Sequence, residues 1–285
     1  MGVGFPAPMS LERENMAKFL TLNTHSWMEE NQLEKLERLA DRIAHQAYDV
    51  ICLQEVNQLI TSHEKKNLKN YQALNDMPAI HEDHFAALLI DYLSDRGHTY
   101  YWSWAYNHIG FDRFHEGVAI LSRKPLRAKA ICVSNVNDPL DYRTRKILLA
   151  ETKVDGQMMS IASVHLSWWN KGFQEEWNRL EKILEKSPYP LILMGDFNNP
   201  VGHEGYKKIL ASCLSLQDSH QVAENVSGSH TVAGEIAGWQ DNQDDLKIDY
   251  VFTNKRLYLK SSSVVFNDID GPIISDHYGL EVVSD

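Results

Sequence analysis

Short apolar runs typical of β-strands recur through most of this chain and constrain its fold more than any other feature. Five follow one another in the middle of the sequence, at residues 100–106, 117–122, 128–134, 146–153 and 158–165. Others lie nearer the two ends, at residues 18–23, 49–55, 190–195, 247–253, 257–266 and 277–283. The pattern predicts a layered protein with many strands.

Four helices are predicted between these strands. The clearest covers residues 31–47, where one helical face carries the apolar residues Leu33, Leu36, Leu39, Ala40, Ile43 and Ala47. Shorter helices are predicted over residues 82–93, 174–184 and 205–211.

The chain shows no repeat and no linker with a shift in composition. We therefore expect a single domain over residues 17–285, preceded by a loose extension over residues 1–16. The long polar stretch at residues 216–246 is predicted to be irregular, and such segments in compact domains are usually functional.

Polar residues stand where several of the apolar runs end or begin. They are Asn23, Glu55, His165, Asp196, Asn198, Asp249, Asp276 and His277. Taken singly, each has an ordinary structural explanation, such as a turn cap, an ion pair or a satisfied core histidine. Ligands of layered proteins collect at strand ends, however, so the recurrence of these residues there predicts one shared functional site.

The balance of charges is acidic, with 39 Asp and Glu against 28 Lys and Arg and a net charge of −11. Proteins that hold nucleic acid usually neutralise phosphates with clustered basic residues, so this composition disfavours a nucleic-acid partner. A local basic groove is still compatible with it. The alternative is that the charge serves only solubility.

Three scattered cysteines, Cys52, Cys132 and Cys213, form neither a disulfide framework nor a zinc-binding spacing. The first residues lack the basic start and apolar core of a signal peptide, and no run is long enough to span a membrane. We therefore expect a reduced, cytoplasmic protein without a membrane partner; the sequence leaves its oligomeric state open.

Four motifs resemble, in order, those of the endonuclease/exonuclease/phosphatase superfamily. They are LQE at 53–55, GDFN at 195–198, IDYV at 248–251 and SDHY at 275–278. That superfamily includes abasic-site endonucleases, pancreatic-type deoxyribonuclease, neutral sphingomyelinases and inositol-phosphate phosphatases. The resemblance runs from Phe19 to Val283. It implies an α+β fold, a four-layer α/β/β/α sandwich of two packed mixed sheets with the site at one edge.

Further runs are similar to the bacterial maltose 6'-phosphate phosphatases. They lie at residues 101–110, 115–122, 164–169 and 171–177. This narrower resemblance implies a Mg²⁺-dependent phosphomonoesterase that converts maltose 6'-phosphate to maltose and phosphate. We expect His115, which opens the second of these runs, to contact the substrate.

A metal ion is expected because phosphate ester hydrolysis requires charge neutralisation. Glu55 is the preferred ligand, since Mg²⁺, or Mn²⁺ in its place, binds carboxylate oxygens. Asn23 and Asp276 are expected to contribute further oxygens.

Asp196 is expected to act as the general base or to position the attacking water, and Asn198 can reach the same side of the chain. His277 is expected to touch a phosphate oxygen while Asp249 keeps its imidazole cationic. The superfamily resemblance implies that His165 is a second donor to the phosphoryl group.

The substrate contacts are less narrowly defined by the sequence. Arg143 and Arg145 alternate on a predicted strand, so one of them could grip phosphate, although a solvated strand edge explains them equally well. Indoles near the predicted strand ends suit the apolar faces of sugar rings, but also unstacked bases and membrane interfaces. They are Trp102, Trp104, Trp168, Trp169 and Trp239. Of the neighbours Trp168 and Trp169, only one is expected to line the site.

Two other functional classes compete with the phosphatase. A phosphodiesterase of the same superfamily, either a nuclease or a sphingomyelinase-like enzyme, would carry the same motifs, but the acidic charge and the missing secretory signal disfavour both. A non-catalytic binding module should have lost part of the motif set, and here every motif residue is retained.

Overall fold

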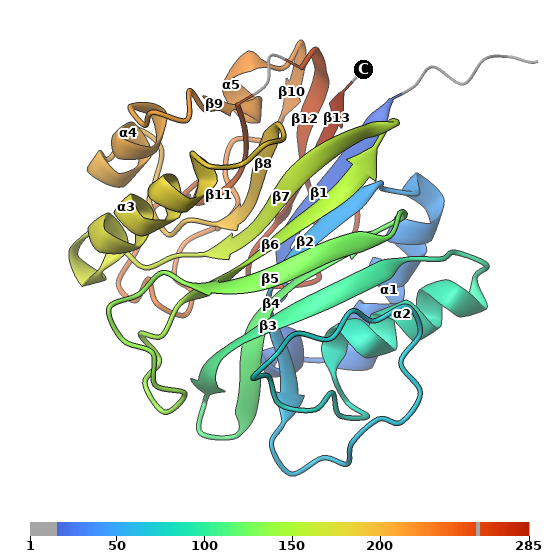
Figure 1. The fold of residues 1–285 in the computed structure, drawn as a ribbon. Helices are drawn as coiled ribbons and strands as arrows, with labels where there is room; N and C mark the ends of the chain where they lie inside the picture. Colours follow the sequence, from blue (N-terminus) through green and yellow to red (C-terminus); the bar gives the residue numbers. More distant parts are fainter. Residues whose placement is uncertain (1–15, 255–256, 285) are drawn as a thin grey trace, which may run out of the picture.

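Two β-sheets packed face to face form the centre of the molecule (Figure 1). The structure is a computed structural model that describes residues 16–254 and 257–284. Within them, the first sheet has seven strands: β1 (Ala17–Asn23), β2 (Val50–Leu59), β3 (Tyr101–Gly110), β4 (Phe114–Ser122), β10 (Asn225–Ser227), β12 (Leu259–Val265) and β13 (Gly279–Ser284). Their order is β10-β12-β13-β1-β2-β4-β3.

The second sheet has six strands in the described part of the chain. They are β5 (Leu126–Cys132), β6 (Lys146–Val154), β7 (Gln157–His165), β8 (Leu191–Asp196), β9 (Gln217–Asp218) and β11 (Asp249–Thr253). Their order is β5-β6-β7-β8-β11-β9. Both sheets are mixed, because β1 and β2 are parallel, as are β7 and β8, while most other pairs are antiparallel.

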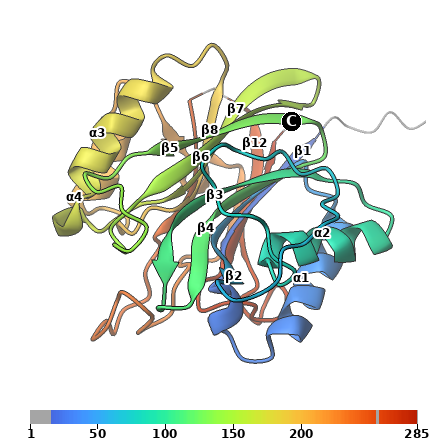
Figure 2. The same ribbon diagram turned by 60° about the horizontal axis from the view of Figure 1, so that its bottom comes forward.

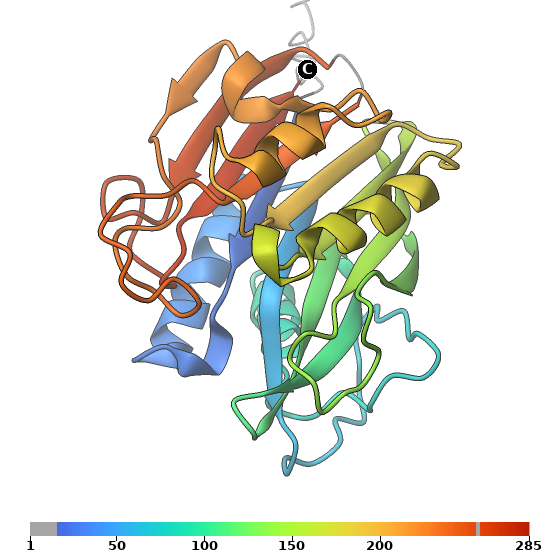
Figure 3. The same ribbon diagram turned by 90° about the vertical axis from the view of Figure 1, so that its left-hand side faces the viewer.

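Helices cover the outer face of each sheet. On the first sheet lie α1 (Gln32–Gln46) and α2 (Phe85–Asp95), and Figure 2 shows them on the side away from the second sheet. On the second lie α3 (Phe173–Leu184) and α4 (Glu204–Leu210), the yellow and orange helices in front in Figure 3. The expected four-layer α/β/β/α sandwich is confirmed.

The apolar runs read as nearly continuous because both faces of each sheet are buried. Along β2, Val50 and Cys52 face the core between the two sheets, whereas Ile51 and Leu53 face the core under α1 and α2. In the helical layers, one stripe of each helix is buried; in α1 it consists of Leu36, Leu39, Ala40 and Ile43.

The predicted helices and main strands all correspond to elements of the structure, and the differences lie at their ends. β2 continues to Leu59, beyond the end of the strand expected over residues 49–55. Residues 216–246 are not wholly irregular, because they contain β9, the short helix α5 (Ser219–Val222) and β10.

Of the predicted N-terminal extension, residues 1–15 lie outside the described residues. The single domain over 17–285 therefore stays a prediction. None of the helices in the described ranges has the length and apolar character needed to cross a bilayer.

Candidate active site

The ends of four strands, β1, β7, β8 and β11, meet a residue within β2 at one edge of the sandwich. In the second sheet, His165 at the end of β7 is paired in register with Asp196 at the end of β8, and Asp196 with Asp249 at the start of β11. From the first sheet, the Asn23 amide Nδ2 donates hydrogen bonds to Glu55 Oε1 (2.9 Å) and to Asp196 Oδ2 (3.2 Å). Asn23 therefore ties the two sheets together at the site.

A β-bulge directs Glu55 toward this edge. In the β2–β4 ladder, Leu53 pairs with Ala119 and Val56 with Gly117, so two residues of β2 stand opposite Val118 alone. Glu55 is one of the two, and its φ of 51° lies in the left-handed region that a residue with a side chain seldom adopts. Bulges of this kind re-aim side chains at functional sites.

The turn after β8 fixes Asp196 and Asn198. Gly195 has a φ of 144°, and a Cβ there would lie 2.0 Å from the Val164 carbonyl oxygen, so only glycine fits. The backbone N–H of Asn198 donates to Asp196 Oδ1 at 2.8 Å. Its side-chain oxygen accepts a hydrogen bond from Trp239 Nε1 at 3.0 Å.

His277 and Asp249 form a buried ion pair beside Asp196. His277 Nδ1 and Asp249 Oδ2 are 2.9 Å apart, and His277 Nε2 lies 3.9 Å from Asp196 Oδ2. Burial alone would lower the pKa of His277, but the charge and hydrogen bond of Asp249 outweigh it and raise the pKa to about 10. The imidazole is therefore cationic at neutral pH.

The charges of the other ionisable groups at this edge do not balance one another. Burial, together with the charge of Asp249, raises the pKa of Asp196 to about 7, and burial beside Glu116 raises the pKa of Glu55 to about 7. His165 lies 3.6 Å from Asp196 and 4.0 Å from Glu55, yet burial and the nearby Arg145 hold its pKa well below its usual value. The site thus carries carboxylates that the protein's own cations do not fully compensate.

This excess suits a divalent cation. Ligand atoms of Asp196, Asp249 and His277 lie within 4.8 Å of one another, a spacing at which such a group could hold a metal ion. Because His277 is cationic and paired with Asp249, the carboxylate oxygens rather than the imidazole would bind it. Asp249 Oδ1 is buried and has no hydrogen-bond partner among the described residues. Carboxylate oxygens such as those of Glu55 are the donors that Mg²⁺ and Mn²⁺ accept. Asn23 turns its amide nitrogen toward Glu55 and Asp196, while its Oδ1 accepts a hydrogen bond from the His25 backbone N–H at 3.2 Å.

Asp276 lies in a neighbouring cluster rather than with these groups. Its Oδ1 is 3.6 Å from His25 Nδ1, and its backbone N–H donates to Glu29 Oε1 at 3.1 Å. The same Glu29 is also paired with Lys35. Asp276 and Glu55 interact electrostatically, but the described residues that line the cavity include neither Asp276 nor Asn23. The expected ligand roles of Asn23 and Asp276 stay predictions.

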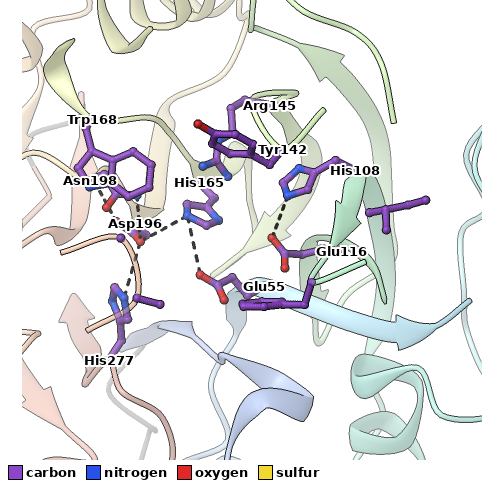
Figure 4. A pocket seen from close by; sticks show the side chains of 15 residues that line it. Glu55, His108, Glu116, Tyr142, Arg145, His165, Trp168, Asp196, Asn198 and His277 are labelled. Atoms are coloured by element: carbon purple, nitrogen blue, oxygen red, sulfur yellow. Dashed lines mark hydrogen bonds and ion pairs between the residues drawn. The ribbon is translucent and has the colours of Figure 1, made fainter. Parts of the chain in front are cut away.

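A cavity of about 230 Å³ opens over these residues (Figure 4). On one side it is lined by Glu55, His165, Asp196, Asn198 and His277. The remaining wall consists of His108, Ile109, Gly110, Phe111, Glu116, Tyr142, Arg145, Trp168, Ala237 and Gly238.

The two arginines differ in their positions. The expected strand through both is wrong, because β6 begins only at Lys146. Arg143 is exposed in the preceding turn and paired with Asp141 at 2.6 Å. Arg145 is buried against the cavity, its Nε lacks a hydrogen-bond partner, and no carboxylate of the described residues lies within ion-pair distance. Arg145 is therefore the cation available to an anionic ligand.

The three expected tryptophan contacts also separate. Trp168 lines the cavity, and the backbone of Gly238 packs against its ring, where a Cβ would come within 2.4 Å of Cζ2. Trp169 begins the short 3-10 helix η2 (Trp169–Lys171) and packs on Phe173 in the core beneath α3. Trp239 holds Asn198 and does not itself line the cavity within the described region.

His115 lies on the far side of β4 from the cavity. Its ring packs edge-on against Tyr106 and its Nδ1 is 3.3 Å from Gln58 Nε2. Since successive residues of a strand face opposite sides, it is the neighbouring Glu116 that reaches the cavity. Glu116, one position further along the chain, thus lines the cavity in place of the expected His115.

Several lining residues were not anticipated from the sequence. His108 Nε2 lies 3.4 Å from Glu116 Oε1, and the two residues are paired across β3 and β4. A hairpin centred on residue 112 places positions 108 and 116 opposite each other, so its spacing was a usable signal. Phe111 and Tyr142 lie in loops, where no periodicity indicates direction.

Comparisons with known proteins agree with this arrangement. The model of the Endonuclease/Exonuclease/phosphatase family matches residues 23–277. A family protein from Leptotrichia buccalis C-1013-b has a similar structure, with a TM-score of 0.82 and 33% identity over 94% of this chain and 99% of its own.

More distant structures share the fold. The mannosyl-6-phosphatase of Bacteroides thetaiotaomicron VPI-5482 has a TM-score of 0.63 at 13% identity, covering 93% of this chain and 98% of its own. D. rerio TDP2 complexed with single strand DNA product has a TM-score of 0.62 at 15% identity, covering 95% and 100%. No match was found among curated proteins. From the family match and the Leptotrichia structure, the chain belongs to the endonuclease/exonuclease/phosphatase family.

Proposed function

We propose that this phosphoesterase is a metal-dependent phosphomonoesterase acting on a phosphorylated sugar, with maltose 6'-phosphate as the foremost candidate. The observation that carries the proposal is the combination in one small cavity of an uncompensated carboxylate centre, a buried free guanidinium and an aromatic rim. The carboxylates that line the cavity include Glu55 and Asp196, Asp249 is buried beside Asp196, and the guanidinium is Arg145.

The chemistry follows from the groups that face the cavity. A divalent cation held by the Glu55 carboxylate, with Asn23 beside it, would neutralise phosphoryl charge. The Asp196 carboxylate has a pKa of about 7, which suits a group that orients a water molecule and accepts its proton. Cationic His277 and the free Arg145 add positive charge for the phosphoryl oxygens, where charge develops in the reaction.

The rim favours a sugar over a longer polyanion. Phe111 and Tyr142 are 48% and 60% exposed, and with Trp168 they border the cavity. Aromatic faces suit the apolar faces of sugar rings. The net charge of −11 opposes the approach of a nucleic acid. The fold likeness to a mannosyl-6-phosphatase is consistent with a sugar phosphate as the substrate. The fold likeness to TDP2 is consistent with the alternative function, a phosphodiesterase. A cytoplasmic location remains a prediction.

A substrate panel tests the proposal. Released phosphate, or cleaved product, should be measured at matched Mg²⁺ for maltose 6'-phosphate, mannose 6-phosphate, single-stranded DNA, abasic duplex DNA and sphingomyelin, each with and without EDTA. We expect the sugar phosphates to give the highest kcat/KM and EDTA to abolish turnover. Asp196→Asn protein purified in parallel shows whether a contaminant is responsible. Faster cleavage of abasic DNA than of any sugar phosphate would overturn the proposal.

A further inference from the structure

Residues 231–246 form a long loop before β11, and its tip reaches the candidate active site. Its two ends are joined, because the backbone N–H groups of Val232 and Leu246 each donate to the other's carbonyl oxygen at 2.9 Å. At the tip, the backbone N–H of Trp239 donates to the Ile236 carbonyl oxygen at 3.0 Å and closes a tight turn. The loop is therefore closed at its base and turned at its tip, which gives Trp239 a defined position.

The tip of this loop contacts the site through consecutive residues. The backbone of Gly238 packs against the Trp168 ring, and Ala237 and Gly238 form part of the cavity wall. The indole Nε1 of Trp239, the next residue, donates to Asn198 Oδ1 at 3.0 Å. Trp239 is half-buried and is not among the described residues that line the cavity. Its indole N–H therefore binds a cavity residue from behind.

This contact decides which end of the Asn198 amide faces Asp196. An indole N–H can only donate a hydrogen bond, so it selects the amide oxygen as its partner. The amide nitrogen Nδ2 is then left to donate to the Leu166 carbonyl oxygen at 3.0 Å and to Asp196 Oδ2 at 3.4 Å. In the reverse orientation, the amide oxygen would face a carbonyl and a carboxylate, while Nδ2 would face the indole N–H. None of these three contacts would then be a hydrogen bond.

The orientation of the Asn198 amide matters for the Asp196 carboxylate. The backbone N–H of Asn198 donates to Asp196 Oδ1 at 2.8 Å, so this one residue contacts both carboxylate oxygens. Asn198 is 3% exposed, so water has little access to its amide oxygen as a replacement for the indole N–H. A turn of the amide would therefore release one of the two contacts that orient the carboxylate.

We propose that Trp239 is a positioning residue for phosphate ester hydrolysis, whose indole N–H holds the Asn198 amide with its nitrogen toward Asp196. The inference rests on the role proposed above for Asp196, but it does not depend on which ester is the substrate. Trp239 acts through Asn198 and touches neither the substrate nor the reacting atoms. Small displacements of a catalytic group are costly, so the loss of this support should slow the reaction rather than weaken substrate binding.

Trp239→Phe removes the indole N–H and retains an aromatic ring in the same place. We expect kcat to fall by about threefold to tenfold, the range for one hydrogen bond, while KM stays close to the wild-type value. Both constants should be measured at matched Mg²⁺ for maltose 6'-phosphate, 4-nitrophenyl phosphate and the diester bis(4-nitrophenyl) phosphate. Trp169→Phe, at a half-buried indole that packs on Phe173, is the matched control and should keep the wild-type kcat.

A double-mutant cycle tests whether Trp239 acts through Asn198. In the Asn198→Ala background, adding Trp239→Phe should change kcat by less than about twofold, because the amide that the indole holds is already absent. The contact can also be observed without any substrate, as the indole N–H signal that Trp239→Phe removes from the NMR spectrum. We expect this proton to exchange slowly with solvent in the wild type and faster in Asn198→Ala.

The possible results separate this inference from the proposed function. Wild-type kcat in Trp239→Phe would overturn the inference, and so would the same loss of kcat with and without the Asn198 side chain. A loss that appears only in KM would make Trp239 a substrate contact and would overturn it too. Hydrolysis of the diester alone would refute the phosphatase and leave the test of Trp239 intact. If the wild type hydrolyses none of the three esters, the proposed function fails, and an indole signal that Asn198→Ala leaves unchanged would overturn the inference as well.

Discussion

At the scale of single residues, the buried Asp196 carboxylate lowers the stability of the folded protein while it serves the proposed reaction. Burial and the charge of Asp249 raise its pKa to about 7, whereas an unfolded chain has an aspartate pKa near 3.9. The folded state therefore disfavours the ionised carboxylate. This cost to folding is fully present above pH 7, shrinks as the pH falls and disappears below about pH 4.

Replacing Asp196 with Asn should thus lower activity and raise stability. We expect kcat to fall by roughly 10²–10⁴, as for loss of an acid–base or electrostatic group. In EDTA at pH 8, Tm should rise by about 2 °C or more, because each kcal/mol shifts Tm by roughly 2–4 °C in chains of 150–250 residues.

Calorimetry at pH 8 and pH 4 checks the predicted direction of the change in Tm, because the gain in Tm of Asp196→Asn should vanish at the lower pH. Asp95→Asn, at an exposed position at the end of α2, should change neither activity nor Tm. A variant at Asp196 with near-normal turnover would remove the role assigned to this carboxylate.

At the scale of elements, the start of α2 depends on a neutral histidine. The side chain of His84 caps this helix by accepting the Ala87 backbone N–H at 3.2 Å. Burial, with the nearby His81, lowers the pKa of His84 to about 3. An unfolded chain has a histidine pKa near 6.5. Between pH 6.5 and 3 the unfolded chain therefore binds a proton that the folded protein excludes, and stability falls as the pH falls.

We expect His84→Asn, which retains a capping side chain, to flatten the acid branch of the stability curve. The free energy of unfolding, measured in urea between pH 4.5 and 7.5, should lose up to about 1.4 kcal/mol per pH unit of its slope. His45→Gln, at an exposed position on α1, is the control. Unchanged slopes in the His84 variant would mean that this histidine is protonated in the folded protein.

At the level of strands and turns, part of the candidate site could be predicted from the sequence and part could not. The strands that carry Glu55, Asp196 and Asp249 were predictable, because apolar periodicity locates strands and motifs locate the polar residues on them. The direction of Glu55 was not, since it depends on a bulge that appears only when β2 is paired with β4. Likewise, Arg143 and Arg145 differ through a turn whose conformation depends on Asp141.

At the scale of the whole molecule, the sandwich brings the carboxylates of Glu55, Asp196 and Asp249 together at one edge of the two sheets. A ligand that binds only the folded state stabilises it in proportion to its affinity. Mg²⁺ at the carboxylate centre should therefore stabilise the entire protein. At a hundredfold excess over Kd, linkage predicts about 2.7 kcal/mol and a rise in Tm of several degrees.

Thermal melting with MgCl₂ and with NaCl at equal ionic strength measures this effect without any substrate. Glu55→Gln should need a higher Mg²⁺ concentration for the same rise, while its melting in EDTA should not fall below that of the wild type. Equal curves in the two salts would exclude a specific cation site at the sheet edge.

The catalytic residues lie on strands and the rim residues lie on loops, and this separation has a consequence for the evolution of the protein. Glu55, Asp196 and Asp249 sit on strands of the two packed sheets, so a change there alters the reaction itself. Phe111 and Tyr142 sit on loops, with 48% and 60% of their surfaces exposed. Insertions and substitutions in loops are tolerated far better than in packed strands. Proteins with this fold can therefore evolve new substrate specificities through substitutions of a few loop residues, while the catalytic residues stay unchanged.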